Sequence, residues 1–483
     1  MQDYVLILSV LFLFCVAFSK FGDKYGIPAL LIFIFVGMFA GSDGIGGIYF
    51  DNGKIAQDIS MLCLILILFS GGFDTTFKFI KPILKEGIIL ATLGVVLTAF
   101  IISLLCYYTL DFKFYDALLL GAIISSTDAA AVFAIMRSKG LKLKNNITPL
   151  LELESGSNDP MAIFLTITII EIITLGTLPS IGTFLFIFLK QFGLALVCGY
   201  IFGISMPFII NKLKFNYWGL YPVFTLAWIY LTFVLSEKIG ANGYLSVYLL
   251  GIFANSKEFV YKKGLIGFFE GTAWIAQVVV FLTLGLLVFP SELPNVALLG
   301  CIIAFFIMFF ARPIAVFLCL VFFKKFNFNE KIFISWVGLR GTVPIILATY
   351  PLAAGIADSH FIFNIVFFIV LTSILIQGIT LNPLAKLLKI IEEEEIMQAS
   401  NIPISYNILK QYTLKENSPI IGKNIAELAL DENFIILLVK RNGEYIKASG
   451  SLIFEDKDLL LVLCDDLNLY KNTLESFNAH EKK

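Results

Sequence analysis

The chain has 483 residues, of which 58% are hydrophobic and only 15% are charged. Soluble domains usually carry about 25% charged residues, and the mean hydropathy is +0.89. The composition therefore predicts a polytopic α-helical membrane protein and excludes an ordinary soluble domain. The formal net charge is −1 and no basic block occurs, so no nucleic-acid partner is expected.

The apolar segments predict about thirteen transmembrane helices, because a spanning helix needs about 20 mostly apolar residues. The predicted spans are 4–19, 27–41, 57–72, 87–109, 114–136, 157–176, 181–210, 218–236, 241–255, 266–289, 295–323, 331–352 and 360–386.

Loop charges predict the orientation, because basic residues gather on the cytoplasmic side of a membrane. The loops after odd-numbered spans contain most of the basic residues: Lys20, Lys24, Lys78, Lys81, Lys85, Arg137, Lys139, Lys142, Lys144, Lys212, Lys214, Lys257, Lys262, Lys263, Lys324, Lys325 and Lys331. The loops after even-numbered spans contain only Lys54, Lys113 and Lys238. We therefore expect the N-terminus outside and the C-terminus in the cytoplasm.

The last part of the chain has a different character. Residues 1–390 form the predicted membrane domain, 391–402 an acidic linker and 403–483 a small cytoplasmic α+β domain. The "RNGE" sequence contains an Asn-Gly turn, which is a strong hairpin signal. Strands are expected at Phe434–Lys440, Tyr445–Ala448, Ser451–Phe454 and Leu459–Leu463, and a helix at Leu467–Phe477.

The fifth predicted span contains "ISSTDAAAVFAI", in which four polar residues, Ser125 to Asp128, follow one another. Such residues propagate a helix poorly. An interrupted helix here would free backbone carbonyls as cation ligands. The alternative is an intact helix in which the hydroxyls bond back to its own carbonyls.

The motif "ESGSNDP", residues 154–160, overlaps the start of the sixth span and contains Glu154, Asn158 and Asp159. An ionisable group at the bilayer centre costs at least ~2.5–3.5 kcal/mol, so those that persist usually pair or serve transport. Pro160 fits the first turn of a helix, and the structural alternative is that Asn158 or Asp159 caps it. Two acids and an amide exceed what a cap requires.

The twelfth span contains "WVGLRGTVP", and its glycines and proline predict a second interrupted helix. Its buried Arg340 needs a carboxylate partner, for which we expect Glu154. Arg312 is expected to pair with Asp74 or Glu86.

The strings "YGIPALLIFIFVGMFAG", "SSTDAAAV", "ESGSNDP" and "GLRGTVP", in this order, resemble the monovalent cation:proton antiporters of the NhaP type that have an Asn-Asp motif. The resemblance covers about residues 1–390. It is strongest to the potassium/proton antiporters, or cell volume regulation proteins, and residues 403–483 resemble their TrkA-C-like (RCK C-lobe) domain.

The resemblance implies a homodimer with inverted repeats in a bacterial inner membrane, active in cytoplasmic pH, cation and volume homeostasis. It implies a cation- and proton-binding site in which Asp159, Ser155 and Thr127 hold the alkali cation. The residues implied at this site are Asp159, Asn158, Asp128, Thr127 and Ser155. Glu154 and Arg340 match the buried structural ion pair of the family.

A buried aspartate is disfavoured in its charged form, so Asp159 can hold either a proton or a cation. Because Asn158 is neutral, one carboxylate carries one charge, which predicts electroneutral 1:1 exchange. The sequence leaves open whether the cation is K⁺ or Na⁺, and no cofactor is expected.

The C-terminal domain is expected to regulate transport, with a small molecule or nucleotide as a possible ligand. The alternative is a folding or assembly module. A rival function for the whole chain is a passive cation channel gated by the tail, but no Thr-Val-Gly-Tyr-Gly filter is present. An enzyme is not expected, because the only histidines, His360 and His480, lie far from the serines of "ESGSND".

Overall fold

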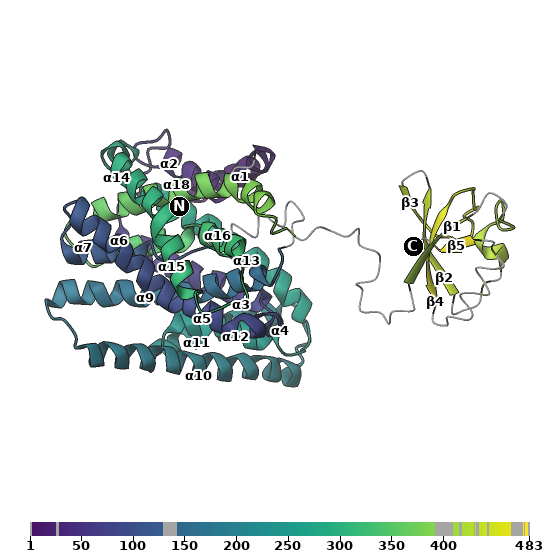
Figure 1. The fold of residues 1–483 in the computed structure, drawn as a ribbon, viewed down its shortest axis with the longest axis horizontal. Coiled ribbons are helices and arrows are strands. Elements are labelled where there is room, and N and C mark those ends of the chain that lie inside the picture. Colours follow the sequence, from purple (N-terminus) through teal and green to yellow (C-terminus); the bar gives the residue numbers. More distant parts are fainter. Residues whose placement is uncertain are drawn as a thin grey trace. The chain divides into compact units, whose positions relative to one another are not determined.

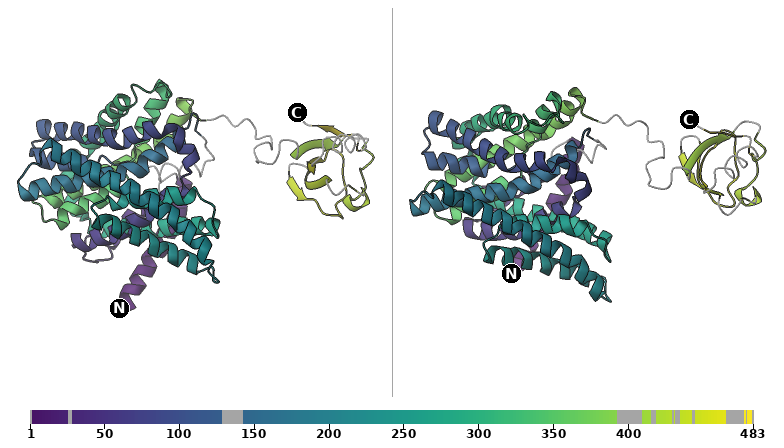
Figure 2. Two further views of the ribbon diagram at one scale, coloured as in Figure 1. Left: turned by 90° about the horizontal axis from the view of Figure 1, so that it is seen from below. Right: turned by 60° about the horizontal axis from the view of Figure 1, so that its bottom comes forward.

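The computed structural model describes residues 2–25, 29–128, 143–391, 409–414, 418–428, 430, 434–441, 444–464, 477 and 479–481. The chain divides into two compact units, residues 1–392 and 393–483. Figures 1 and 2 show the long helices of the first unit lying side by side with broadly aligned axes.

The regular elements in the described part of the first unit are all helices. Its elements are α1 (Gln2–Tyr25), α2 (Ala29–Ala40), α3 (Gly53–Asp74), α4 (Phe77–Ile80), α5 (Leu84–Ile89), α6 (Val95–Thr109), α7 (Phe114–Ile123), α9 (Ile147–Leu175), α10 (Ile181–Leu213), α11 (Leu220–Lys238), α12 (Gly243–Asn255), α13 (Lys262–Leu287), α14 (Leu293–Phe306), α15 (Arg312–Cys319), α16 (Phe328–Trp336), α17 (Thr342–Ala353) and α18 (Ser359–Leu387). Short 3-10 turns occur at Lys81–Ile83 and Pro290–Glu292, and π-helical turns at Leu90–Gly94 and Ile307–Ala311.

These helices confirm the predicted fold class. Among the described residues, 8 helical segments are long and apolar enough to cross a membrane. Shorter apolar helices occur at Leu6–Lys20, Ala29–Ala40, Phe114–Ile123, Gly243–Asn255 and Thr342–Ala353. Helices satisfy their own backbone groups in lipid, which explains why the apolar runs take this form. The number of thirteen spans stays a prediction.

Two of the predicted spans are interrupted, as expected. The first breaks after α7, and residues 126–128 are not helical. The second breaks between α16 and α17, at residues 338–341. The expected remainder of the first broken helix lies at 129–136, outside the described residues.

One element order occurs twice in the membrane unit. Helices α4 to α6 contain a π-helical turn and are followed by the interrupted α7 and the long α9. Helices α14 and α15 flank another π-helical turn and are followed by the interrupted pair α16–α17 and the long α18. This duplication agrees with the repeats that the family resemblance implies.

Glycines allow several helices to approach closely, as is common between membrane helices. A Cβ on Gly37 of α2 would lie 2.6 Å from the carbonyl oxygen of Leu282 in α13, and one on Gly72 of α3 would lie 2.2 Å from that of Tyr248 in α12. Helices α2, α3, α12 and α13 therefore form one tightly packed group, with α10 against α12.

The second unit contains a five-stranded antiparallel sheet in the order β3-β2-β4-β1-β5. Its strands are β1 (Leu409–Leu414), β2 (Phe434–Arg441), β3 (Glu444–Lys447), β4 (Leu459–Cys464) and β5 (Ala479–Glu481). The hairpin around the Asn-Gly turn is confirmed, because Arg441 pairs with Glu444.

Two expectations for the tail were wrong or incomplete. Residues 451–454 form no regular strand; Ile453 makes only an isolated bridge with Asn424. Strands β1 and β5 were not predicted, and the expected helix at 467–477 lies almost entirely outside the described residues.

Candidate cation site

The two helix interruptions meet at one point in the membrane unit. The backbone N–H of Asp128 donates to the carbonyl of Leu339 (2.8 Å), which joins the two non-helical segments directly. The backbone N–H and the hydroxyl of Thr342, the first residue of α17, both donate to Asp128 Oδ2, at 3.3 and 3.4 Å. Asp128 thus caps the N-terminus of α17 from another segment, where the helix dipole favours a negative charge.

Gly341 makes this approach possible. A Cβ at Gly341 would lie 2.0 Å from Asp128 Oδ2 and 2.5 Å from its Cβ. Any larger residue would therefore displace either the carboxylate or the start of α17. The glycine in "GLRGTVP" is explained by this contact, since its φ of −116° does not require glycine.

Helix α9 presents three side chains to the interruption after α7. Ser126 donates from Oγ to Asp159 Oδ1 (2.5 Å). Asn158 donates from Nδ2 to Thr127 Oγ1 (2.5 Å). Ser155 donates from Oγ to the carbonyl of Thr127 (3.1 Å).

The structure therefore brings together all five residues proposed for the cation and proton site. Asn158 is fully buried and Asp159 is 7% exposed. The contact of Ser126 with Asp159 was not expected, although Ser126 belongs to the polar run that predicted the interruption.

The structural alternative, in which Asn158 or Asp159 caps a helix, is excluded, whereas the predicted start of this span at residue 157 was wrong. Helix α9 begins at Ile147, ten residues before the predicted span, and Asn146 occupies the N-cap position. Pro160 consequently lies inside the helix. Because proline has no N–H, it cannot donate to the carbonyl four residues earlier, which belongs to Gly156.

Oxygen atoms without a hydrogen-bond donor thus occur on residues near Asp159 in the sequence. Besides its own carboxylate, the Gly156 carbonyl lacks its usual helical donor, and Asn158 Oδ1 is buried and accepts no hydrogen bond from the described part of the chain. Hard cations take oxygen ligands of this kind, so the donor set fits an alkali cation.

The predicted ion pair between Glu154 and Arg340 requires a correction. Glu154 Oε1 binds Arg312 Nη2 instead, and both residues are at least 98% buried, with exposures of 1% and 2%. Asp74 and Glu86 were the expected partners of Arg312, but the ion pair of Arg312 is with Glu154. Arg312 begins α15 directly after a π-helical turn, and such turns change the direction in which the following side chains point.

Arg340 lies beside the Glu154–Arg312 ion pair, but its own hydrogen bonds are to other groups. Its Nη1 donates to the carbonyl of Gly338 (2.7 Å), and its backbone N–H donates to Ser373 Oγ (3.0 Å). A Cβ on Gly338 would lie 2.8 Å from Arg312 Nε and 3.1 Å from Arg340 Nη1. The glycine therefore allows two guanidinium groups to pack against one stretch of backbone.

Comparison with known proteins assigns the membrane unit. Residues 7–387 match the family model described as "Sodium/hydrogen exchanger, transmembrane". The chain belongs to the sodium/hydrogen exchanger family. Residues 409–471 match the TrkA-C domain. Family membership makes the chain a multi-pass membrane transporter that exchanges cations for protons, and not an enzyme.

Relatives in this family match almost the entire chain. The "K(+)/H(+) antiporter NhaP" of Alkalimonas amylolytica is 38% identical over 466 residues, which are 95% of this chain and 81% of the relative. The "K(+)/H(+) antiporter NhaP2" of Shewanella baltica is 38% identical over 474 residues, or 97% and 82% of the two chains.

A solved structure shares the fold. The sodium proton antiporter MjNhaP1 of Methanocaldococcus jannaschii superposes with a TM-score of 0.70 at 23% identity, and covers 80% of this chain and 99% of its own. The fold of this exchanger family member is thereby confirmed.

Proposed function

We propose that the protein exchanges one K⁺ or Na⁺ for one H⁺ by competition of the two ions for Asp159. The observation that carries the proposal is the position of Asp159, buried where α9 meets the interruption after α7 and hydrogen-bonded to Ser126. At such a point, unwound backbone and carboxylate oxygens serve as cation ligands in transporters.

The charges around the crossing, the point at which residues 126–128 meet residues 338–341 and α9, support a stoichiometry of one to one. Among the described residues there, Arg312 and Arg340 are positive, and Glu154, Asp128 and Asp159 are negative. The cluster therefore carries one net negative charge when Asp159 is ionised. One proton or one monovalent cation neutralises it, and two bound ions would leave an uncompensated buried charge, which is costly.

The site residues have separate roles in this proposal. Asp159 binds the exchanged ion through the carboxylate oxygen that Ser126 leaves free. Asn158, Ser155 and Thr127 hold α9 against the interrupted helix and supply neutral oxygens. Asp128 fixes the start of α17, so that the two interruptions move together. Exchange then follows if the ion-loaded protein changes its access from one face to the other more readily than the empty protein.

Replacing Asp159 tests this assignment directly. Asp159→Asn removes the titrating group and keeps the size of the side chain, so cation-driven proton movement in reconstituted vesicles should be abolished. Asp51→Asn, on an exposed loop, is the matched control and should exchange normally. Retention of pH-dependent exchange by Asp159→Asn would refute the assignment. Cation current without proton movement in the wild type would instead favour the tail-gated channel.

We further propose that the protein is a homodimer in a bacterial inner membrane, with its C-terminus in the cytoplasm. The bias of basic residues toward one set of loops supports this orientation. On this orientation the start of α9 faces the cytoplasm and its end faces the outside.

We propose that the TrkA-C domain regulates transport. Its effect passes through the segment by which the chain leaves the membrane unit. Ile391, the first residue of the predicted linker, forms a β-bridge with Leu143. Beside it, Lys144 N donates to the carbonyl of Ile390 (3.0 Å). Because Lys144 lies three residues before α9, a ligand-dependent change in the tail can bias the helix that carries Asp159. Such a ligand must bind two states of the protein with different affinities.

A further inference from the structure

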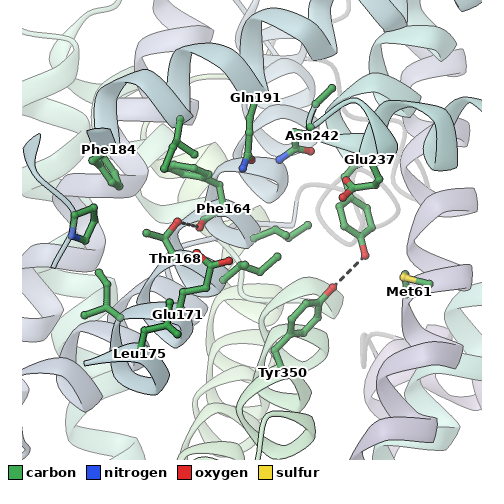
Figure 3. Close-up of a pocket in the computed structure, with 18 of the residues that line it drawn as sticks. Met61, Phe164, Thr168, Glu171, Leu175, Phe184, Gln191, Glu237, Asn242 and Tyr350 are labelled. Carbon is green, nitrogen blue, oxygen red and sulfur yellow. Dashed lines mark hydrogen bonds between the residues drawn. The ribbon is translucent and has the colours of Figure 1, made fainter. Parts of the chain in front are cut away.

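A cavity of about 750 Å³ lies beside the C-terminal half of α9. Residues of α3, α9, α10, α11, α12 and α17 line it (Figure 3). Its charged lining comprises three carboxylates, Asp58, Glu171 and Glu237, and one ammonium group, Lys54. This excess of negative charge favours cations over anions inside the cavity.

The inner end of the cavity comes within about one helical turn of the candidate site. Ile163, four residues after Asp159, is the first residue of α9 in its wall. Asn242, another wall residue, donates from Nδ2 to the carbonyl of Pro160 (3.2 Å). The cavity wall thus touches the residue that follows Asp159 directly.

Two tyrosines meet across this inner end. The hydroxyl oxygens of Tyr244, on α12, and Tyr350, on α17, lie 3.0 Å apart, and both residues line the cavity. Figure 3 shows the hydroxyl of Tyr350 at this hydrogen bond, with Glu237 and Met61 on the same side of the cavity. Tyr244 is only 5% exposed, and its ring packs edge-on against Phe233 of α11.

The hydrogen bond joins α12 to α17, the helix whose first residue binds Asp128. Helix α12 packs mainly with α3 and α10. Helix α17 begins at Thr342, which binds Asp128 at the crossing itself. One turn further along α12, Tyr248 donates from its hydroxyl to the carbonyl of Glu152 on α9 (3.3 Å). Helix α12 therefore contacts the crossing elements on both sides of Asp159.

A hydrogen bond between two neutral hydroxyls can open and close the inner end of the cavity reversibly. Water can replace each partner at small net cost, because a typical hydrogen bond contributes little to stability once solvent is counted. Neither hydroxyl carries a charge that would repel a cation. When the two separate, each also offers an oxygen atom to a passing ion.

We propose that this cavity is the route by which the alkali cation reaches Asp159 from the C-terminal side of α9, and that Tyr244 and Tyr350 form the gate at its inner end. The proposal rests on the proposed function, because it takes Asp159 as the destination. It adds two residues that determine access and do not bind the ion in the closed state.

The experiment measures apparent KM for K⁺ and for Na⁺ from each face of oriented vesicles. Tyr350→Phe and Tyr244→Phe remove one hydroxyl and keep the ring. Either change should favour the state open to the cavity by roughly fivefold, as expected for one neutral hydrogen bond. The ratio of the cavity-side KM to the opposite-side KM should fall by the same factor. Tyr230→Phe removes a hydroxyl bond to the Leu62 carbonyl, and neither of these residues lines the cavity, so this control should leave the ratio unchanged.

A purely structural role for the tyrosines would lower the maximal rate or the yield of protein without changing this ratio. An unchanged ratio in both variants, or an equal change in Tyr230→Phe, would overturn the proposal. The test of the gate can be distinguished from the test of the binding site. If Asp159→Asn keeps pH-dependent exchange, the site assignment fails, whereas the ratio in the tyrosine variants reports on the gate alone.

Discussion

Replacing Arg312 by alanine should destabilise the membrane unit through Glu154. The two side chains form an ion pair and are 3% and 2% exposed, so the variant would leave a carboxylate buried without its partner. Breaking a buried pair in this way typically costs about 3–5 kcal/mol, most of it from the uncompensated charge. We expect a loss of that size in the free energy of unfolding, measured by denaturant titration of the purified protein in detergent.

A second variant separates charge from packing. Arg312→Met together with Glu154→Gln removes both charges and keeps most of the volume, and such replacements are often neutral or stabilising. Most of the lost stability should therefore return. Glu86→Gln and Asp74→Asn should leave the effect of Arg312→Ala unchanged. Wild-type stability in Arg312→Ala, or no recovery in the double variant, would refute the pairing.

Three further predictions follow from contacts at the site and on the loops. Gly341→Ala introduces a Cβ 2.0 Å from the carboxylate that caps α17, and should abolish exchange in vesicles although the protein is still made. Ser126→Ala removes the hydrogen-bond donor to Asp159, and this loss favours the protonated carboxyl over the carboxylate. The apparent KM for the cation at fixed pH should therefore rise roughly tenfold, as for one charge-assisted hydrogen bond. An unchanged KM would exclude the contact. Hydrogen bonds from the hydroxyl and the N–H of Ser291 hold the pKa of Asp43 below its ordinary value. That contact is present above the unfolded pKa and is lost as pH falls through the lower folded pKa. The protection of the Ser291 amide against hydrogen exchange, relative to its intrinsic rate at each pH, should therefore fall only below about pH 4.

Local sequence was enough to predict where the helices break. Four successive polar residues after Ile124, and the glycines around Arg340, are poor helix formers in an otherwise apolar chain, and both interruptions occur there. The motif "ESGSNDP" likewise indicated Asn158 and Asp159, because ionisable groups in a membrane segment are costly unless they serve a purpose.

Long-range pairing was less predictable, because sequence spacing does not show which helices touch. Glu154 has two buried arginines near it, and only the packing of α15 decides that Arg312 forms the ion pair. The early start of α9 was missed, because Glu152 and Glu154 lower the hydropathy of its first turns. No local signal distinguishes Tyr244 and Tyr350 from the other aromatic residues of apolar helices.

The most direct test of the central claim counts protons released when the cation binds. Purified protein in weakly buffered detergent solution is titrated with KCl or NaCl at a pH at which Asp159 is protonated, and a pH indicator records the release. Competition for one carboxylate predicts one proton released per cation bound, and none from Asp159→Asn. Cation binding to the wild type without any proton release would contradict the account.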